Sequence, residues 1–258
     1  MSADALLRVE ELAKGFGGLQ AVNRVSFEVR EGQIKALIGP NGAGKTTIFN
    51  LLTGMLPADG GTVTFAGRAL LRMSAHRIAA LGVGRTFQTA LLFDQMTVLE
   101  NVMVGRHLHG RTSIFAAALR TPGVAAEERE HREAAMATLE QAGLADCAPS
   151  PADSLPIGQR KLVEVARALA AGPRLLLMDE PAAGLNMRET DQMGELIQTV
   201  RDGGVTVLLV EHDMSLVMSI SEEILVLDHG DRLAEGPPDE IRHNEAVLAA
   251  YLGQEADD

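Results

Sequence analysis

The fold of this chain is decided by Gly39-Pro40-Asn41-Gly42-Ala43-Gly44-Lys45-Thr46. These residues fit the phosphate-binding pattern G-x-x-x-x-G-K-[ST] with no mismatch. The mostly apolar run Ile34–Ile38 before them predicts a buried strand, and Thr47–Leu52 after them has the apolar spacing of a helix. The order of strand, glycine-rich loop and helix is the context that this pattern requires, so the sequence predicts a nucleoside triphosphate site.

The chemistry of such a site follows from the residue types. Glycines let backbone N–H groups turn inward around a polyphosphate, and the helix N-terminus adds a favourable dipole. We expect Lys45 to reach the β- and γ-phosphates of ATP and the Thr46 hydroxyl to bind Mg²⁺. The predicted ATP contacts here are Gly39, Pro40, Asn41, Gly42, Ala43, Gly44, Lys45, Thr46 and Thr47. The alternative, a glycine-rich turn that happens to precede Lys-Thr, is disfavoured by the flanking elements.

A pair of carboxylates forms the second landmark. Leu175–Met178 reads as a buried strand, and Asp179 and Glu180 follow at its carboxyl end. Ligands of open α/β sheets bind at that edge. Asp179 suits a role on Mg²⁺ and Glu180 a role beside the attacking water. This pair is a weak signal by itself, but together with Lys45 it predicts a metal and nucleotide site.

Two further side chains are candidates for the same site. His212 follows the predicted strand 205–210 and can hydrogen-bond a γ-phosphate, although a lone histidine is more often structural. Phe16 lies in a predicted loop, residues 14–18, between two alternating runs (6–12 and 23–29) that predict antiparallel strands. It could stack on an adenine or pack under its loop, and the local sequence leaves both readings open.

Composition limits the classes of protein to which this chain can belong. It has 258 residues, 46% of them hydrophobic, and 35 acidic against 23 basic residues give a net charge of −12. That balance disfavours a nucleic-acid partner. No apolar run approaches the ~20 residues of a membrane helix, and the N-terminus lacks the features of a signal peptide. We therefore expect a soluble, intracellular chain whose membrane role, if any, comes through a partner.

The order of these motifs resembles that of the ATP-binding cassette (ABC) ATPases over essentially the whole chain. The phosphate loop, Gln88, Gly158-Gln159 before a helix, Asp179-Glu180 and His212 occur in the family's order. The stretches 180–186, 210–214 and 250–253 are similar to the ATP-binding subunits of branched-chain amino acid importers of the LivG type.

The resemblance implies a role for each motif residue. Phe16 would stack on adenine, and Gln88 would sense the γ-phosphate and metal. Glu180 would be the general base, with His212 positioning the γ-phosphate and water. The signature loop, which completes the ATP site of the opposite subunit in the family, would be Leu155, Pro156, Ile157, Gly158 and Gln159. The metal ligands would be Thr46, Gln88 and Asp179.

Two positions depart from the family's pattern. Its signature usually reads Leu-Ser-Gly-Gly-Gln, whereas Pro156 and Ile157 replace the serine and the first glycine here. Asn186 stands where an aspartate is usual, a change shared by the LivG-type subgroup. Because proline suits the first turn of a helix, we expect Pro156 to fix the entry of the helix that follows.

The resemblance further implies an α/β fold: a P-loop NTPase core with an antiparallel β-subdomain and an α-helical subdomain (about 95–170). Residues 1–258 would form one nucleotide-binding domain with an acidic tail, 254–258. The implied cofactors are ATP and Mg²⁺. The implied partners are a second ABC ATPase subunit (the same chain or a related paralogue), a membrane permease and, indirectly, a solute-binding protein. The chain would sit on the cytoplasmic face of the membrane.

The resulting functional prediction is an ATPase that powers uptake of branched-chain amino acids or related small polar solutes. One alternative is a soluble ABC-type ATPase acting on ribosomes or DNA, but such proteins usually carry tandem cassettes, a coiled coil or basic arms. Another is a P-loop kinase, against which the paired carboxylates and the Gly-Gln signature argue.

Overall fold

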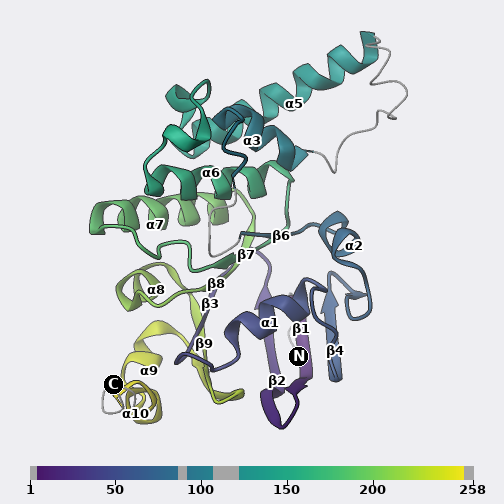
Figure 1. Cartoon of the computed structure of the whole chain (residues 1–258). Coiled ribbons are helices and arrows are strands. Elements are labelled where there is room, and N and C mark those ends of the chain that lie inside the picture. The colour runs from purple at the N-terminus through teal and green to yellow at the C-terminus, as the bar shows by residue number, and fades with distance from the viewer. Residues whose placement is uncertain (1–4, 87–91, 107–121, 253–258) are drawn as a thin grey trace.

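The computed structural model of this protein describes residues 5–86, 92–106 and 122–252 (Figure 1). A six-stranded sheet runs through its centre in the order β10 (Asp231–Gly236), β9 (Glu223–Asp228), β3 (Ile34–Ile38), β8 (Thr206–Val210), β7 (Leu175–Asp179) and β6 (Val83–Arg85). Strands β9 to β6 are parallel, and β10 pairs antiparallel with β9. The phosphate loop (residues 39–46) leaves the carboxyl end of β3, in the interior of this sheet.

Strands β3, β7 and β8 are buried at every residue, as their apolar runs predict. Their side chains divide between the two faces of the sheet because a strand alternates its side chains. Leu208 and Val210 of β8 join one core cluster, whereas Val207 and Leu209 join another. Continuous apolar strands are therefore the mark of a sheet covered on both faces, and the predicted α/β fold is confirmed.

Different elements cover the two faces. Helix α1 (Lys45–Leu52) and a second sheet share the first cluster with β3, β7 and β8. Helix α7 (Met187–Asp202) packs on the other face through Met193, Ile197 and Val200. Helix α8 (Met214–Ile220) continues that face toward the C-terminus with Val217, which contacts α9 (Pro238–Arg242) and α10 (Glu245–Leu252) in a further cluster.

The second sheet is antiparallel, in the order β2 (Leu19–Arg30), β1 (Ala5–Phe16), β4 (Gly60–Phe65) and β5 (Arg68–Ala69). The two alternating runs are confirmed as the paired strands β1 and β2. The predicted loop over 14–18 is wrong, because β1 continues to Phe16 and only Gly17 and Gly18 separate the strands. Gly17 has a φ of +58°, which lets the hairpin turn this tightly. Phe16 therefore lies at a strand end.

Three helices gather at one end of the molecule (Figure 1): α3 (Val98–Gly105), α5 (Pro122–Gln141) and α6 (Ile157–Ala170). They enclose a small core of their own that includes Val102, Leu139 and Val163. A Cβ on Gly105 would stand 2.0 Å from the Arg167 carbonyl oxygen, so α3 approaches α6 more closely than any side chain would allow. Short helix α2 (Ala75–Ala80) lies between β5 and β6.

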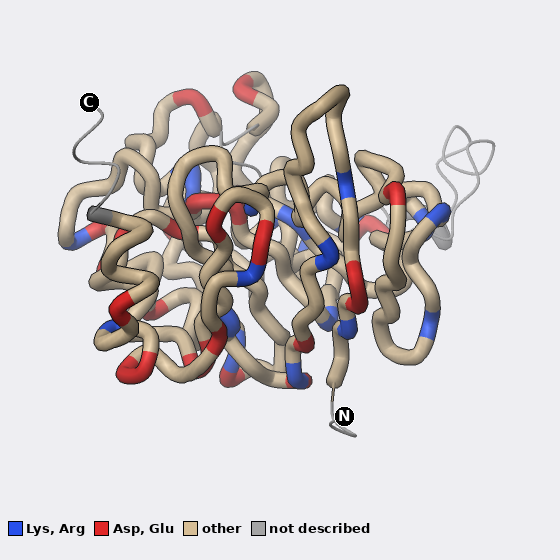
Figure 2. Tube along the Cα trace, turned by 90° about the horizontal axis from the view of Figure 1, so that it is seen from below, with Lys and Arg blue, Asp and Glu red and all other residues tan. Residues whose placement is uncertain are grey.

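The charged residues are mixed in sign along the chain. Seen from below, acidic and basic positions are interspersed along the described trace (Figure 2), although the sequence as a whole is acidic. Within the described ranges, none of the helices has the length and apolar character needed to cross a membrane.

Candidate nucleotide site

The phosphate loop has a backbone that only glycine tolerates at two of its positions. Gly39 and Gly44 have φ angles of +149° and +103°. A Cβ on Gly39 would lie 2.2 Å from the Leu227 carbonyl oxygen, and one on Gly44 would lie 2.4 Å from that of Ala21. Gly44 also caps α1 without a side-chain hydrogen bond, so the first-turn N–H groups of α1 keep no side-chain acceptor at their cap. Such a helix start is an anion site.

Lys45 is folded over the loop that precedes it. Its Nζ donates to the carbonyl oxygens of Gly39 (2.6 Å) and Pro40 (2.9 Å), and only 6% of the residue is exposed. Burial lowers the pKa of Lys45, while the charges of Glu180 and Asp179 act in the opposite direction. The structure thus brings the lysine of the loop and the two predicted carboxylates into one electrostatic environment.

Glu180 has a strained backbone at the end of β7. Its φ is +51°, which is uncommon for a residue with a side chain. Two contacts hold this conformation: the Glu180 N–H donates to the Val210 carbonyl (2.8 Å), and Lys161 Nζ donates to the Glu180 carbonyl (3.1 Å). Strain of this kind persists where neighbouring contacts fix it, and it occurs at functional sites.

The side chain of Glu180 contacts His212 directly. Glu180 Oε1 and His212 Nε2 are 2.7 Å apart. Buried Glu211 supports this contact, since its carboxylate accepts from the N–H of His212 (2.8 Å) and from that of Ala182 (2.6 Å), two residues after Glu180. The two residues predicted to act on the γ-phosphate and water therefore meet at one edge of the sheet.

Asp179 ends β7 and is almost buried. Burial raises the pKa of its carboxyl, whereas a hydrogen bond and the charge of Arg85 act in the opposite direction. This carboxylate and the exposed Thr46 hydroxyl are hard oxygen donors, which suit Mg²⁺. Within the described part of the chain, no group of three or more His, Cys, Asp or Glu residues could form a protein cage for a metal. Mg²⁺ commonly binds through one or two protein oxygens and substrate phosphates, so these residues fit it.

Phe16 is 45% exposed at the tip of the first hairpin. Lys14 Nζ lies 5.4 Å from the centre of its ring, and Asp59 holds that end of β1. The Asp59 carboxylate accepts from Lys14 Nζ (2.8 Å) and from the Gly15 N–H (2.8 Å). These two contacts, the N–H of Gly15 foremost, lower the pKa of Asp59. The structure therefore presents an anchored, exposed ring.

The predicted signature loop divides between the surface and the interior. Pro156 is the N-cap of α6, one position before the first turn in which it was expected, and Ile157 is 58% exposed. Leu155 packs against the core of the three helices, and Gln159 accepts a weak contact from Cys147 Sγ at 3.9 Å. Of these five residues, Pro156 and Ile157 are exposed, whereas Gly158 is buried.

Gly158 has a role within its own chain. A Cβ there would lie 2.5 Å from Oε1 of Glu189, which forms a capping box with Asn186 at the start of α7. Gly158 thus lets the starts of α6 and α7 lie against each other. Met187, the first residue of α7, is 84% exposed beside this junction. Ile157 and Met187 together form an apolar feature that we call the α6–α7 tip.

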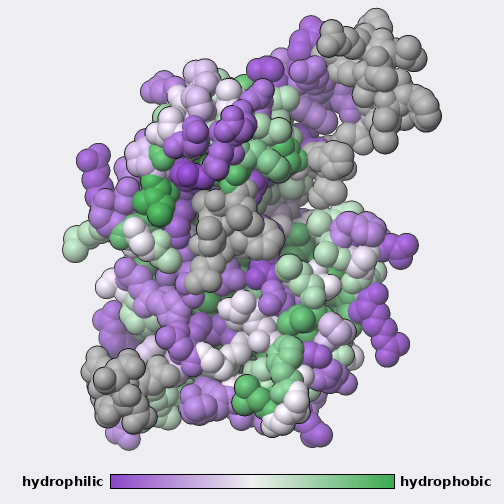
Figure 3. Space-filling view, viewed as in Figure 1, coloured by the Kyte–Doolittle hydropathy of each residue, from purple (hydrophilic) through white to green (hydrophobic). Residues whose placement is uncertain are grey.

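The predicted sensor Gln88 lies outside the described residues. The apolar character of the stretch that follows it, residues 89–93, predicts a docking face beside the phosphate site. Within it, Leu92 packs against the core of the three helices, whereas Phe93 is 50% exposed. Fully buried Asn101 accepts from the Phe93 N–H (2.8 Å) and donates to its carbonyl (3.1 Å). Hydrophobic side chains gather on this part of the surface near α3 (Figure 3).

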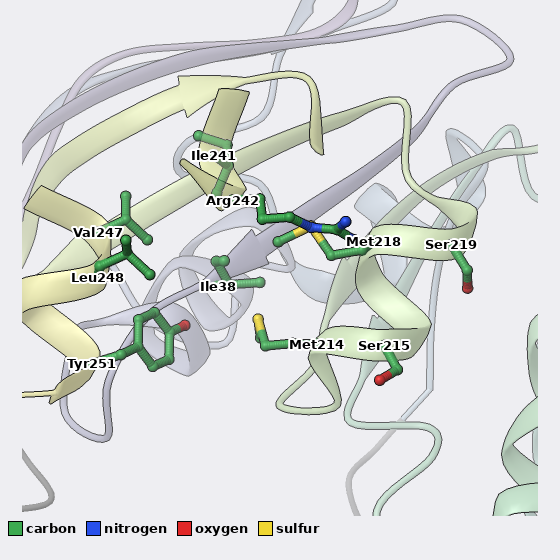
Figure 4. A pocket seen from close by; sticks show the side chains of 10 residues that line it. All are labelled: Ile38, Met214, Ser215, Met218, Ser219, Ile241, Arg242, Val247, Leu248 and Tyr251. Atoms are coloured by element: carbon green, nitrogen blue, oxygen red, sulfur yellow. The ribbon is translucent and has the colours of Figure 1, made fainter. Parts of the chain in front are cut away.

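A cavity of about 600 Å³ lies behind the phosphate loop, between α8, α9 and α10 (Figure 4). Its lining is mostly apolar and includes Ile38, the residue before the loop. The Tyr251 hydroxyl points toward Ile38 (Figure 4). Burial raises the pKa of Tyr251 to about 12, against the opposing effect of a hydrogen bond from the Gly39 N–H. The C-terminal helix α10 therefore reaches the first glycine of the loop.

Four charged residues of the site were not predicted: Lys161, Glu211, Arg85 and Asp59. The sequence pattern could have indicated that Lys161 is buried, because it stands four positions before Val165 on the apolar stripe of α6. The others contact residues that are distant in sequence. Arg85 and Asp179, for example, are 94 residues apart.

Two protein-family models match parts of this chain. The model of the ABC transporter family matches residues 22–183, and that of the branched-chain amino acid ATP-binding cassette transporter matches residues 232–257. The high-affinity branched-chain amino acid transport ATP-binding protein BraF of Pseudomonas aeruginosa is 47% identical over 250 residues, covering 96% of this chain and 98% of BraF. LivG of Escherichia coli is 45% identical with the same coverage.

A more distant relative has a different cargo in its name. The lipopolysaccharide export system ATP-binding protein LptB of Escherichia coli is 34% identical and covers 97% of this chain and 98% of LptB. Among solved structures, the ADP conformation of MJ1267, an ATP-binding cassette of an ABC transporter, superposes with a TM-score of 0.85. That chain is 32% identical, and the match covers 96% of this chain and 99% of MJ1267.

Proposed function

Because this chain belongs to the ABC transporter family, we propose that it is the ATP-hydrolysing subunit of an importer for branched-chain amino acids or related small polar solutes. The cargo class is supported by identities of 45–47% to LivG and BraF against 34% to LptB. The match of residues 232–257 to the branched-chain amino acid family supports it independently. The whole chain would act as one nucleotide-binding unit on the cytoplasmic face of the membrane.

The observation that carries the proposal is the contact between Glu180 and His212 beside Lys45. A carboxylate that accepts the proton of a water is the general base that hydrolysis requires. An Nε2–H of His212 that donates to Glu180 would orient the carboxylate. Glu211 fixes the backbone at His212 and, two residues after Glu180, at Ala182 through their N–H groups.

Binding of ATP requires one local rearrangement. Lys45 must exchange its bonds to the carbonyls of Gly39 and Pro40 for the β- and γ-phosphate oxygens. Thr46 and Asp179, with Gln88 as a further predicted ligand, would hold Mg²⁺, which supplies positive charge to the phosphates when it is bound. The exposed Phe16 ring is the candidate for stacking on the adenine.

The alternatives predict different products. A P-loop kinase would transfer the γ-phosphate to a small acceptor, whereas this site is expected to release inorganic phosphate without one. Measuring phosphate release from ATP with the purified chain, with and without candidate acceptors, separates the two. Release that depends strictly on an acceptor would contradict the proposal.

The other alternative, a soluble ABC-type ATPase, would show no association with a membrane permease.

We further propose that a second ATPase subunit, identical or paralogous, completes the site through the α6–α7 tip. Ile157 and Met187 are among the most exposed large hydrophobic side chains of the described residues, which suits an interface. The proposed interface would bring the first-turn N–H groups of α6, next to Pro156, toward the partner's phosphates. Because Pro156 has neither a hydroxyl nor an N–H to offer, these backbone donors would replace the usual serine.

Ile157→Glu is expected to prevent ATP-dependent dimerisation, because it places a charge in the apolar tip and close to the partner's γ-phosphate. Size-exclusion chromatography with light scattering, in the presence of ATP and Mg²⁺ and in a hydrolysis-deficient background, measures the effect. Leu248→Glu is the control, since Leu248 is also exposed (48%) but lies on α10. A dimer that survives Ile157→Glu would place the interface elsewhere.

Phe93→Glu is expected to reduce association with the permease at least about tenfold, because an exposed aromatic ring on a pinned loop is typical of an interaction anchor. Leu92 is unsuitable for this test because it packs in the core. Co-purification of the permease with the variant chain measures the loss, and phosphate release by the isolated chain is the control for folding. Unchanged co-purification would exclude Phe93 from the docking surface.

A further inference from the structure

Arg85 is a nearly buried cation at the metal side of the site. It is the last residue of β6, and its side chain is 10% exposed. Its Nη2 donates to Oδ2 of Asp179 at 3.0 Å. The guanidinium carbon lies 5.7 Å from the centre of the Phe49 ring, on α1. Arg85 is thus packed between the strand that carries Asp179 and the helix that starts at the phosphate loop.

The other arm of Arg85 holds that helix. Nη1 donates to Asn50 Oδ1 at 2.7 Å and to Thr53 Oγ1 at 3.3 Å. Asn50 belongs to α1, and Thr53 is its C-cap. A planar guanidinium with several donors can make these contacts at once, which a lysine cannot. The predicted metal ligand and the phosphate-loop helix therefore share one cation.

The ion pair between Arg85 and Asp179 compensates the charge of a buried carboxylate. The Asp179 side chain is only 5% exposed, and a buried carboxylate without a compensating charge is strongly destabilising. When Mg²⁺ and nucleotide are bound, the metal would supply this compensation. In their absence, Arg85 supplies it at the same carboxylate.

We propose that Arg85 is a built-in counterion that competes with Mg²⁺ for Asp179 and thereby limits the metal affinity of the nucleotide site. This inference rests on the proposed function, because it requires a nucleotide–metal complex at the loop. A cation paired with a metal ligand competes with the metal for that ligand, and bound metal in turn weakens the ion pair. Arg85 is accordingly a positioning residue, which acts through Asp179.

The test uses the full chain with ADP and Mn²⁺ as the metal probe, and electron paramagnetic resonance reports the free Mn²⁺. Arg85→Gln is expected to bind Mn²⁺ about tenfold more tightly than the wild type, since the Asp179 carboxylate no longer has to give up an ion pair when the metal binds. The rise in Tm on adding Mn²⁺ to the ADP complex should also be larger in the variant, because its metal-free form has lost the counterion. A purely structural role would change stability and leave Mn²⁺ affinity equal or weaker.

Two comparisons locate the effect. Arg174→Gln is the matched control, since Arg174 also pairs with a carboxylate (Glu31, 2.8 Å) and lies over a ring (Phe65, 5.9 Å). It is expected to leave Mn²⁺ affinity unchanged. In an Asp179→Asn background, Arg85→Gln should no longer tighten Mn²⁺ binding, because the competition acts through that carboxylate. A tightening that persists there, or that Arg174→Gln reproduces, would overturn the proposal.

Two further outcomes distinguish failure of the proposed nucleotide function from failure of the counterion role of Arg85. If the wild type binds Mn²⁺ only weakly and equally with and without ADP, the proposed nucleotide function itself fails. If the wild type binds Mn²⁺ with ADP and Arg85→Gln does not tighten it, only the counterion role fails. Should Arg85→Gln not fold, Arg85→Lys replaces it. A shorter, single-point charge is expected to pair less well with Asp179 and to tighten Mn²⁺ binding about threefold, and unchanged or weaker binding would contradict the proposal.

Discussion

Replacing Glu180 with glutamine is expected to leave ATP binding nearly unchanged while slowing hydrolysis by about 10²–10⁴-fold, the range for loss of a general base. Glutamine has the shape of glutamate and can keep the contact with His212, which is 2.7 Å in the wild type. It cannot accept the proton of the attacking water. The φ of +51° at this position is equally available to both residues, so the backbone should not move.

Single-turnover phosphate release and equilibrium ATP binding measure the two effects separately. Because ATP persists in the variant, the chain should also dimerise with ATP and Mg²⁺. Glu195→Gln is the control, since Glu195 is an exposed glutamate of α7. Hydrolysis by Glu180→Gln at a rate near that of the wild type would exclude Glu180 as the base.

Replacing Lys45 with alanine is expected to weaken ATP binding by about 10–100-fold, because a hydrogen bond to a charged group contributes ~1.5–3 kcal/mol. The loss occurs at an earlier step than that of Glu180→Gln. Lys45 also donates to the carbonyls of Gly39 and Pro40, so the variant removes contacts within the loop as well.

Lys45→Met separates these causes, since methionine fills much of the volume of lysine without its charge. Both variants should lose ATP affinity, and Lys45→Met should keep more of the Tm of the wild type. Isothermal titration with a non-hydrolysable ATP analogue gives the affinities. Equal affinity in the wild type and both variants would mean that Lys45 does not contact the phosphates.

The local sequence contained enough information for the core of the fold. The apolar runs of β3, β7 and β8 have no polar alternation, which occurs where both faces of a strand are buried, and the structure has them in a parallel sheet. The glycines of the phosphate loop require positive φ angles, and a strand end fixes the edge at which ligands bind. These are properties of contiguous residues, so the sequence shows them directly.

The sequence pattern was less informative where the structural role of a residue depends on contacts with distant segments of the chain. Phe16 was assigned to a loop, yet pairing with β2 extends β1 to that residue, and Asp59 adds contacts with Lys14 and Gly15. Gly158 was assigned to the signature loop from the order of the motifs, and the structure adds a contact that the order does not show, the fit of Gly158 against Glu189 of the same chain. Both outcomes depend on contacts with other segments of the chain.

By itself, the sequence determined the α/β class, the phosphate loop and the edge at which Asp179, Glu180 and His212 stand. Only the tertiary structure decided which charges meet there. The contacts of Arg85 with Asp179 and of Lys161 with the Glu180 carbonyl join segments far apart in the chain. They follow from the strand order, in which β6 is the neighbour of β7, and from the packing of α6 over that edge. Hydrophobic periodicity indicates whether a side chain is buried. It does not indicate which other segment of the chain buries that side chain, so it cannot identify the residue with which a charged group pairs.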